Sequence, residues 1–276
     1  MHIENILNLE QYPLNDRENP QRRQLVEQCK SDLANNLYCV IPNIILTEAL
    51  DAMSAEAKGL LPVSNHNNAL RNCYLHRQVD ASLAEDHPRN LQDRSSVRMI
   101  AYDQIPDTSP LKLFYQSEMV RQLVAEIVNE GELFVNEDPY QPANYVCYRN
   151  KDESSWHFDS DNSFTMTLMI QPSDSGGNFE MSPNTRSLPD ENYEHVGEVL
   201  GGKRNDTVIS VGREPGALCI FKGCNSLHRV TPVRSDKLRI MGVFVYEFSA
   251  GIVGDPEVNA TIYGPRVAEA MSGVDG

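Results

Sequence analysis

Two residues with metal-binding side chains, His157 and Asp159, lie two positions apart in the stretch SWHFDSD at residues 155–161. On an extended strand, residues i and i+2 point to the same face, so the imidazole and the carboxylate would project side by side. With one distant histidine they would form the 2-His-1-carboxylate set, which holds non-heme Fe(II) and leaves coordination positions open for chemistry. The pair alone is a weak signal, because His-x-Asp also occurs by chance. Whether the pair belongs to a metal site therefore depends on a third ligand elsewhere in the chain.

The third ligand has one good candidate. After residue 161 the only histidines are His195 and His228. His195 lies in the polar, helix-like run DENYEHVGEVL, which favours a surface position, whereas His228 lies in SLHRVTPV, a predicted strand. A satisfied core histidine is the alternative interpretation of His228. We predict that His157, Asp159 and His228 together form a metal site.

Arg239 is predicted to face the same interior as His228. The Ser-Asp dipeptide at 235–236 is a plausible two-residue turn between SLHRVTPVR and KLRIMGVFVYEF. Pairing across this turn sets His228 opposite Val243 and puts Arg239 roughly 13 Å from His228 along the strands, at about 3.3 Å per residue. An arginine and a five-carbon diacid would bridge that span. Because a buried arginine needs a partner, and a carboxylate held bidentately is the best one, we expect Arg239 to bind a carboxylate.

The elements that position these residues are expected to form a single domain over residues 1–276. We divide it into a helical flank with lid elements over 1–130, a jelly-roll core over 131–250 and an irregular C-terminal tail over 251–276. The core contains eight short apolar runs separated by Pro, Gly, Asn, Asp and Ser, which is typical of a closed or double-sheet β architecture such as a jelly roll. One interruption, at about 190–200, is predicted to be helical.

The first 130 residues show helical spacing of apolar residues in three places. The first predicted helix begins at Pro20, and the other two follow the cap residues Thr47 and Ser117. Short strands are predicted at YCVIP and from Val97. Segment 62–93 has no clear period, so we expect a long loop that is either a lid or plain surface.

Composition limits the partners. The net charge of -15, from 24 Lys+Arg against 39 Asp+Glu, argues against nucleic acid and anionic membrane. No apolar run approaches the ~20 residues of a membrane span, and the N-terminus lacks the features of a signal peptide. None of the six cysteines forms a Cys-x-x-Cys pair, which favours a reduced, cytoplasmic protein. The oligomeric state stays open, and a homo-oligomer is compatible with the sequence.

Four segments resemble the Fe(II)/2-oxoglutarate-dependent oxygenases: SWHFDSD, GGNFEMSPNTR, GALCIFKGCNSLHRVTPV and LRIMGVFVYEF. Together with HPRNLQDRSS and YDQIPDTSPLKLFYQSEMVRQLVAEI upstream, they resemble the branch that contains the radical halogenases and the hydroxylases of free amino acids, including lysine. The resemblance covers about residues 85–250. It implies a double-stranded β-helix with flanking helices, iron ligands at His157, Asp159 and His228, and Arg239 as the anchor for the distal carboxylate of 2-oxoglutarate.

The retained carboxylate distinguishes two outcomes within that branch. The resemblance implies that halogenases carry a small residue in place of the carboxylate ligand, which leaves room for chloride. This sequence keeps Asp159. We therefore expect hydroxylation with O2 as co-substrate, and not halogen transfer.

A free amino acid as substrate needs a cation for its carboxylate and an acid for its ammonium. The resemblance suggests Arg94 for the carboxylate, with Arg98 and Arg77 as rivals. Candidates for binding an amine are acidic residues near the predicted site: Asp161, Glu137 and Asp138. Each of these has an alternative interpretation as a surface or turn residue.

An acidic protein suits a basic substrate, so lysine is the first choice and ornithine the second. Val243 and Val245 are apolar and predicted to face inward, which would instead suit an aliphatic amino acid. Two other classes remain open: a cupin-like metal dioxygenase that does not use 2-oxoglutarate, and a non-catalytic jelly-roll binding module. Arg239 argues against the first class, because such an enzyme needs no buried arginine on that face.

Overall fold

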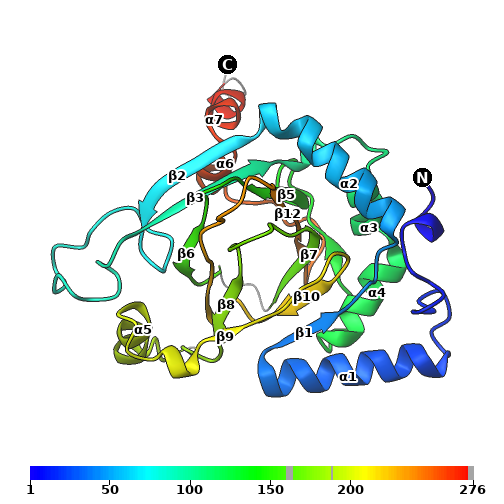
Figure 1. The fold of residues 1–276 in the computed structure, drawn as a ribbon, viewed down its shortest axis with the longest axis horizontal. Coiled ribbons are helices and arrows are strands. Elements are labelled where there is room, and N and C mark those ends of the chain that lie inside the picture. The colour runs from blue at the N-terminus through cyan, green and yellow to red at the C-terminus, as the bar shows by residue number, and fades with distance from the viewer. Residues whose placement is uncertain (160–163, 188, 273–276) are drawn as a thin grey trace.

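The computed structural model describes residues 1–159, 164–187 and 189–272, and two antiparallel sheets face each other in it (Figure 1). The seven-stranded sheet has the order β1 (Tyr38–Ile41), β10 (Leu218–Phe221), β7 (Thr165–Gln171), β12 (Arg239–Phe244), β5 (Ala143–Tyr148), β3 (Asp93–Ile100), β2 (Asn65–Arg71). The four-stranded sheet has the order β6 (Ser154–His157), β11 (Leu227–Val230), β8 (Phe179–Ser182), β9 (Ile209–Ser210). A two-stranded ribbon pairs β13 (Tyr246–Glu247) with β4 (Phe134–Val135).

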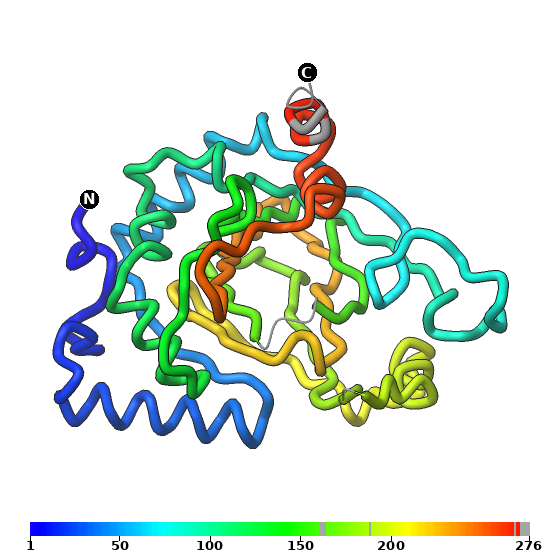
Figure 2. Tube along the Cα trace, turned by 180° about the vertical axis from the view of Figure 1, so that it is seen from behind, coloured from blue at the N-terminus to red at the C-terminus, as the bar shows by residue number. Residues whose placement is uncertain are grey.

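Helices flank the sheets. The α-helices are α1 (Pro20–Asn36), α2 (Thr47–Leu60), α3 (Pro110–Gln116), α4 (Glu118–Ile127), α5 (Tyr193–Leu200), α6 (Pro256–Tyr263) and α7 (Pro265–Ser272). Short 3-10 helices span Ile3–Asn5, Leu61–Val63, Tyr102–Gln104 and Asn205–Thr207. Figures 1 and 2 show α1 to α4 gathered on one side of the sheets, with α6 beside β2. No helix in the described ranges is both long and apolar enough to cross a membrane.

The alternation of side chains along β12 separates two cores. Ile240 and Phe244 belong to the large apolar cluster between the seven-stranded sheet and helices α1 to α4. Met241 and Val243 point the other way, into a smaller cluster between the two sheets. Arg239 shares their face by the period of two. The space between the sheets is thus partly polar, and this space holds the site.

Much of the predicted architecture is confirmed. All eight runs of the predicted core are strands, from β5 to β12, and the helix predicted at 190–200 is α5. Two facing sheets of short antiparallel strands with flanking helices form the predicted jelly-roll class. No disulfide joins the six cysteines, all of which lie in the described part of the chain.

The predicted loop at 62–93 is wrong in part, because it contains the seven-residue strand β2. This strand lies at the edge of the large sheet and pairs with β3, with Asn67 opposite Val97. Its inward-facing residues include Asn67 and Arg71, which line a cavity instead of an apolar core. The outward-facing Leu70 is 57% exposed. The usual alternation of apolar and polar residues is therefore missing.

The predicted hairpin between β11 and β12 is also wrong. β11 pairs with β6 and β8 in the small sheet, whereas β12 pairs with β5 and β7 in the large one. The connection crosses between the sheets, since the backbone of Val233 bonds to Asp152 and that of Arg234 bonds to Ser175. His228 consequently faces the interior from one sheet and Arg239 from the other.

The irregular tail predicted from residue 251 is wrong, because it forms two helices. Asp255 caps α6 by accepting hydrogen bonds from two backbone amides, and Pro256 occupies the first helical position. Pro265 begins α7 after Gly264, which has φ +87. The glycine and prolines that suggested irregular chain are helix-boundary residues here.

Candidate active site

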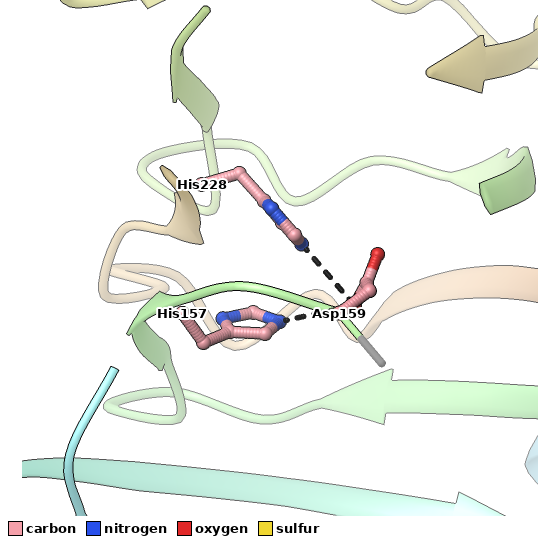
Figure 3. Close-up of side chains that lie close together, drawn as sticks. All are labelled: His157, Asp159 and His228. Carbon is pink, nitrogen blue, oxygen red and sulfur yellow. Dashed lines mark ion pairs between the residues drawn. The ribbon is translucent and has the colours of Figure 1, made fainter. Parts of the chain in front are cut away.

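The two predicted histidine ligands lie side by side on neighbouring strands of the small sheet. His157 at the end of β6 is the direct register partner of His228 on β11, and their ring centroids are 4.2 Å apart. Asp159 Oδ1 lies 3.5 Å from His228 Nε2 and 3.8 Å from His157 Nε2 (Figure 3). One ligand atom from each residue falls within 4.8 Å of the others. The structure thus brings the predicted triad together.

Both imidazoles are oriented by their own chain. His157 Nδ1 donates to the carbonyl of Ser155 at 2.8 Å, and His228 Nδ1 donates to the carbonyl of Ser226 at 2.9 Å. A carbonyl can only accept, so Nδ1 of each ring carries a proton and Nε2 is the nitrogen that faces Asp159. In metal sites, a hydrogen bond from the ring nitrogen that does not bind the metal commonly fixes the orientation of the histidine, as Nδ1 does here.

The electrostatics favour metal binding. Burial, and then the neighbouring His228, lower the pKa of His157 to about 3, so its imidazole is neutral. Burial would raise the pKa of Asp159, but His228, His157 and the Thr165 hydroxyl outweigh burial and hold that pKa below its usual range. A neutral imidazole and an ionised carboxylate are the forms that bind metals.

Asp159 fits only because its neighbour Gly223 has no side chain. The Asp159 amide donates to the carbonyl of Gly223 at 3.1 Å, and the Thr165 hydroxyl donates to Asp159 Oδ2 at 2.5 Å. A Cβ on Gly223 would lie 2.8 Å from Asp159 Cγ and 2.7 Å from Thr165 Oγ1. Gly223 comes from KGCN, just before the strand that carries His228.

The triad opens into a cavity of about 200 Å³ between the two sheets. Apolar side chains form much of its wall: Val97, Met99, Val146, Phe221, Met241 and Val243. Two arginines also line it, Arg71 and Arg213. Asp159 is the only carboxylate among the described lining residues.

Arg239 is buried between the sheets with most of its hydrogen-bonding capacity unused. It is 1% exposed, and its Nε donates to the carbonyl of Gly177 at 2.8 Å. Both Nη atoms are buried and have no partner among the described residues. Its guanidinium lies 5.0 Å from the ring centroid of Tyr148, and burial lowers its pKa to about 10. A Cβ on Gly177, which has φ +66, would approach Arg239 Cδ to 2.8 Å.

Two arginines that the sequence did not indicate as site residues line the cavity. Arg213 lies on the connection between β9 and β10, and Arg71 ends β2. Arg71 donates to the hydroxyls of Ser95 at 3.0 Å and Ser154 at 3.2 Å. Turn-rich surroundings and a segment without period favoured a solvent-exposed position for each of them.

The arginines predicted to bind substrate do not line the cavity. Arg94 points outward from β3, is 43% exposed, and bonds to Asn68 and the carbonyl of Lys151. Arg98 lies 3.8 Å from Asp152. Arg77 reaches Asn67 at 3.2 Å. In the large sheet Arg71 replaces them as the arginine at the cavity wall.

The predicted acids also lie apart from the cavity. Glu137 accepts a hydrogen bond from the Gly251 amide. Asp138 accepts bonds from the amides of Tyr140 and Gly254 and from the Asn259 side chain, which is a structural role. Asp161 lies outside the described residues. The inward position predicted for Val243 agrees with the structure, whereas Val245 is not among the lining residues.

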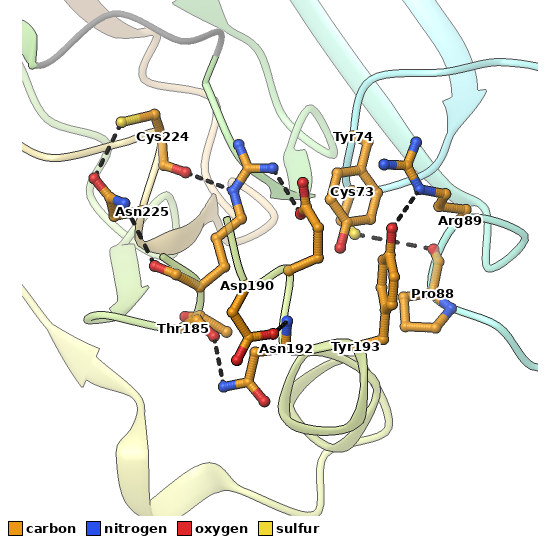
Figure 4. A network of polar contacts seen from close by, with 12 residues as sticks. Cys73, Tyr74, Pro88, Arg89, Thr185, Asp190, Asn192, Tyr193, Cys224 and Asn225 are labelled. Atoms are coloured by element: carbon orange, nitrogen blue, oxygen red, sulfur yellow. Dashed lines mark hydrogen bonds and ion pairs between the residues drawn. The ribbon is translucent and has the colours of Figure 1, made fainter. Parts of the chain in front are cut away.

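A second cavity, of about 330 Å³, touches Asp159 from another side. Its wall includes Arg186, whose guanidinium lies 4.2 Å from the Phe158 ring centroid, and Tyr74, over which Arg89 lies at 4.7 Å. Figure 4 shows Tyr74 and Arg89 beside Tyr193 at the start of α5, where Arg89 donates to the Tyr193 hydroxyl. This network fixes the backbone at Phe158, whose amide donates to the Cys73 carbonyl.

The family model described as Halogenase D matches residues 21–255. The chain belongs to the Halogenase D family. No curated protein matches it in sequence. Similar solved structures include a 2OG-Fe(II) oxygenase family oxidoreductase from Burkholderia pseudomallei, with a TM-score of 0.51, 14% identity, and coverage of 82% of this chain and 92% of that one.

Two further structures show the same fold. A prolyl hydroxylase in complex with a hypoxia inducible factor peptide fragment, from Trichoplax adhaerens, has a TM-score of 0.53 at 15% identity and covers 84% of this chain and 94% of its own. The epimerase SnoN in complex with Fe3+, alpha ketoglutarate and nogalamycin RO has a TM-score of 0.53 at 12% identity, covering 82% and 84%. The prediction of an enzyme among the Fe(II)/2-oxoglutarate oxygenases is confirmed by family and fold, whereas its lysine hydroxylase branch is not.

Proposed function

We propose that this chain hydroxylates an unactivated C–H bond of a free amino acid, with Fe(II), 2-oxoglutarate and O2, releasing succinate and CO2. The observation that carries this proposal is the combination of Asp159 with His157 and His228 at one end of a cavity and the unpartnered guanidinium of Arg239 between the same sheets. One set suits a metal, and the other suits a carboxylate.

The triad fits Fe(II). Two imidazoles and one carboxylate, grouped within 4.8 Å, are the donor set of non-heme iron oxygenases. His157, Asp159 and His228 would hold the metal, which supplies with 2-oxoglutarate and O2 the oxidant for C–H hydroxylation. The apolar residues around the triad keep water from that oxidant. The cavity wall positions the substrate carbon.

Arg239 fits the distal carboxylate of 2-oxoglutarate. Its two unpartnered Nη atoms can donate a bidentate pair of hydrogen bonds, and its Nε is already held by Gly177. Leaving two such donors buried and unsatisfied is unfavourable, which a bound carboxylate would correct. A cupin-like dioxygenase without 2-oxoglutarate, or a non-catalytic module, would have no use for this arrangement.

Asp159 favours hydroxylation over halogenation, although the family carries a halogenase name. A halide could bind iron only where no protein ligand binds. Asp159, which lies beside both histidines, would occupy the position that a halide needs. Thr165 and the backbone of Gly223 hold Asp159 there. The side chain is therefore built into the site and is not incidental to it.

Arg71 is the best placed residue to bind the substrate carboxylate. It lines the cavity from the edge strand β2, its guanidinium is held by Ser95 and Ser154, and its charge acts on Asp159. Arg94, the residue suggested by the family resemblance, lies outside the cavity wall. We assign the carboxylate to Arg71.

The choice of amino acid follows from the rest of the wall. Among the described lining residues Asp159 is the only acid, so the ammonium of a lysine or ornithine side chain has no partner there. Val97, Met99 and Val243 suit an aliphatic side chain. An aliphatic amino acid thus fits the described wall best. Lysine, the first choice from the sequence, would need an acid from residues 160–163, where Asp161 lies.

The test is reconstitution with Fe(II) under anaerobic conditions, followed by O2 and a panel of free amino acids. Succinate release that depends on one amino acid, and a product heavier by one oxygen in mass spectrometry, are expected. Leucine, isoleucine and valine should exceed lysine and ornithine. If no amino acid increases succinate formation, the proposed substrate class is rejected. No dependence on 2-oxoglutarate would reject the reaction.

A further inference from the structure

Arg213 is a second buried guanidinium without a counter-ion. It is 8% exposed, and its Nη1 donates to the Thr167 hydroxyl at 2.8 Å. Its Nε and Nη2 are buried and have no partner among the described residues. The remaining face of the guanidinium lies 4.2 Å from the ring centroid of Phe179. The Cys219 thiol interacts with this guanidinium, but burial raises the pKa of Cys219 to about 11, so the thiol is neutral and supplies no counter-charge. The buried donors of Arg213 therefore lack a charged acceptor among the described residues, which indicates a missing ligand.

Arg213 and Arg239 act on each other as like charges. The positive charge of Arg213 helps to lower the pKa of Arg239, after burial, and burial also lowers the pKa of Arg213. No carboxylate contributes to either shift, and neither arginine joins an ion pair in the described chain. Two cations buried near each other without an acid are unfavourable, and an anion between them would relieve both.

The sheet register places the supporting residues on the same inner face. Tyr148 on β5 is the register partner of Arg239 and is acted on by both arginines. Thr167 on β7 is the register partner of Val243, two positions beyond Met241 on β12. Arg213 enters from the connection before β10 and reaches this face through Thr167. The two guanidiniums also contact positions that are only two residues apart, because Arg239 donates to the carbonyl of Gly177 and Arg213 lies over the ring of Phe179.

We propose that Arg213 and Arg239 hold the distal carboxylate of 2-oxoglutarate between them, with Thr167 fixing the orientation of Arg213. This inference rests on the proposed function. It adds a second arginine to the anchor. The negative charge of the bound carboxylate would then reduce the repulsion between the two guanidinium groups. Arg213 is thereby a specificity residue that selects a 2-oxo acid with a distal carboxylate.

Binding measured by calorimetry on the anaerobic Fe(II)-loaded protein tests the proposal. Arg213→Met should lower the affinity for 2-oxoglutarate at least about tenfold, which is the size expected for the loss of one charged hydrogen bond. Binding of 2-oxopentanoate, which has the same carbon chain without the distal carboxylate, should not change. Arg213→Lys should restore part of the affinity for 2-oxoglutarate. Arg229→Met is the matched control, because Arg229 is paired with Glu180 at 2.7 Å and packs on Trp156.

The melting temperature of the metal-free protein gives an independent readout. Removing one of two repelling charges should leave it unchanged or raise it in Arg213→Met. A purely structural arginine would lower it instead, with 2-oxoglutarate affinity unaltered. Wild-type affinity for 2-oxoglutarate in Arg213→Met, or equal losses for both oxo acids, would overturn the proposal. Failure of the wild-type protein to bind 2-oxoglutarate would reject the proposed function itself.

Discussion

The two sheets contribute different kinds of side chain to the same site. Those of the small sheet already have hydrogen-bond partners, whereas those in and beside the large sheet lack them. In the small sheet, His157 and His228 are register partners with their Nδ1 atoms already bonded. In and beside the large sheet, four buried nitrogen donors of Arg239 and Arg213 have no hydrogen-bond partner within the described ranges. The metal side is therefore organised before any ligand binds, whereas the anion side is satisfied only by a ligand.

This difference has an energetic consequence. Bonds from Ser155 and Ser226 orient the imidazoles without ligand, so metal binding requires little rearrangement. Each unpaired donor of the arginines loses water contacts and gains nothing until a carboxylate arrives. We expect substitutions on the metal side to remove function outright, and those on the anion side to change mainly the dependence on ligand concentration.

Asp159→Ala should have the largest effect, because it removes a ligand and its negative charge from the complete side of the site. Hydroxylation should fall by more than about a hundredfold, beyond what the loss of a residue supporting a ligand costs. Chloride can replace both the charge and the ligand, so added chloride should restore part of the iron content. Efficient chlorination is not expected, since the surrounding residues are not arranged for it.

Iron content and product analysis with and without chloride measure this effect. Wild-type hydroxylation by the chloride-free variant would show that Asp159 is not a ligand. The contrast between the two sheets would then lose its metal side.

Arg239→Leu should act on ligand affinity. It removes two charged hydrogen bonds, each worth about 1.5–3 kcal/mol, so the 2-oxoglutarate concentration for half-saturation should rise at least about a hundredfold. Arg234→Leu is the control, because Arg234 is exposed on the connection that precedes the same strand. Unchanged saturation in Arg239→Leu would remove this arginine from the anchor.

The metal side could be predicted from the sequence and much of the anion side could not. His157 and Asp159 are close in the chain, so the sequence pairs them correctly, although β6 ends at His157 and contacts with Gly223 and Thr165 complete the placement of Asp159. Arg239 was placed inside correctly although its pairing with β11 was wrong, because the alternation along β12 fixes its face whichever strand lies beside it. Arg213 and Arg71 face inward only because of how distant segments cross, and a charged residue in a turn-rich segment gives no local sign of that.

Gly223→Ala should have a moderate effect and tests how tightly the metal side is built. The new Cβ would lie 2.8 Å from Asp159 Cγ, so the carboxylate must move away from the histidines. Iron affinity should fall about 10- to 100-fold, as for other changes that disturb ligand orientation. Gly59→Ala is the matched control, since a Cβ there meets nothing within 4 Å and favours helix α2. Equal iron affinity in both variants would mean that the site tolerates displacement of Asp159.

Arg71→Met should have the smallest effect and separates substrate binding from both other functions. Arg71 is half-buried and held by two serine hydroxyls, so one charged contact to the substrate carboxylate should be lost, raising KM for the amino acid about tenfold. Iron content and 2-oxoglutarate affinity should stay near wild type, because the hydrogen bonds of Arg71 go to Ser95 and Ser154 and not to the triad or Arg239. Arg94→Met, one strand away with its side chain 43% exposed, should leave KM unchanged. If Arg94→Met raises KM and Arg71→Met does not, the substrate binds outside the described cavity wall. The outer face of the large sheet, where Arg94 lies, would then bind the substrate.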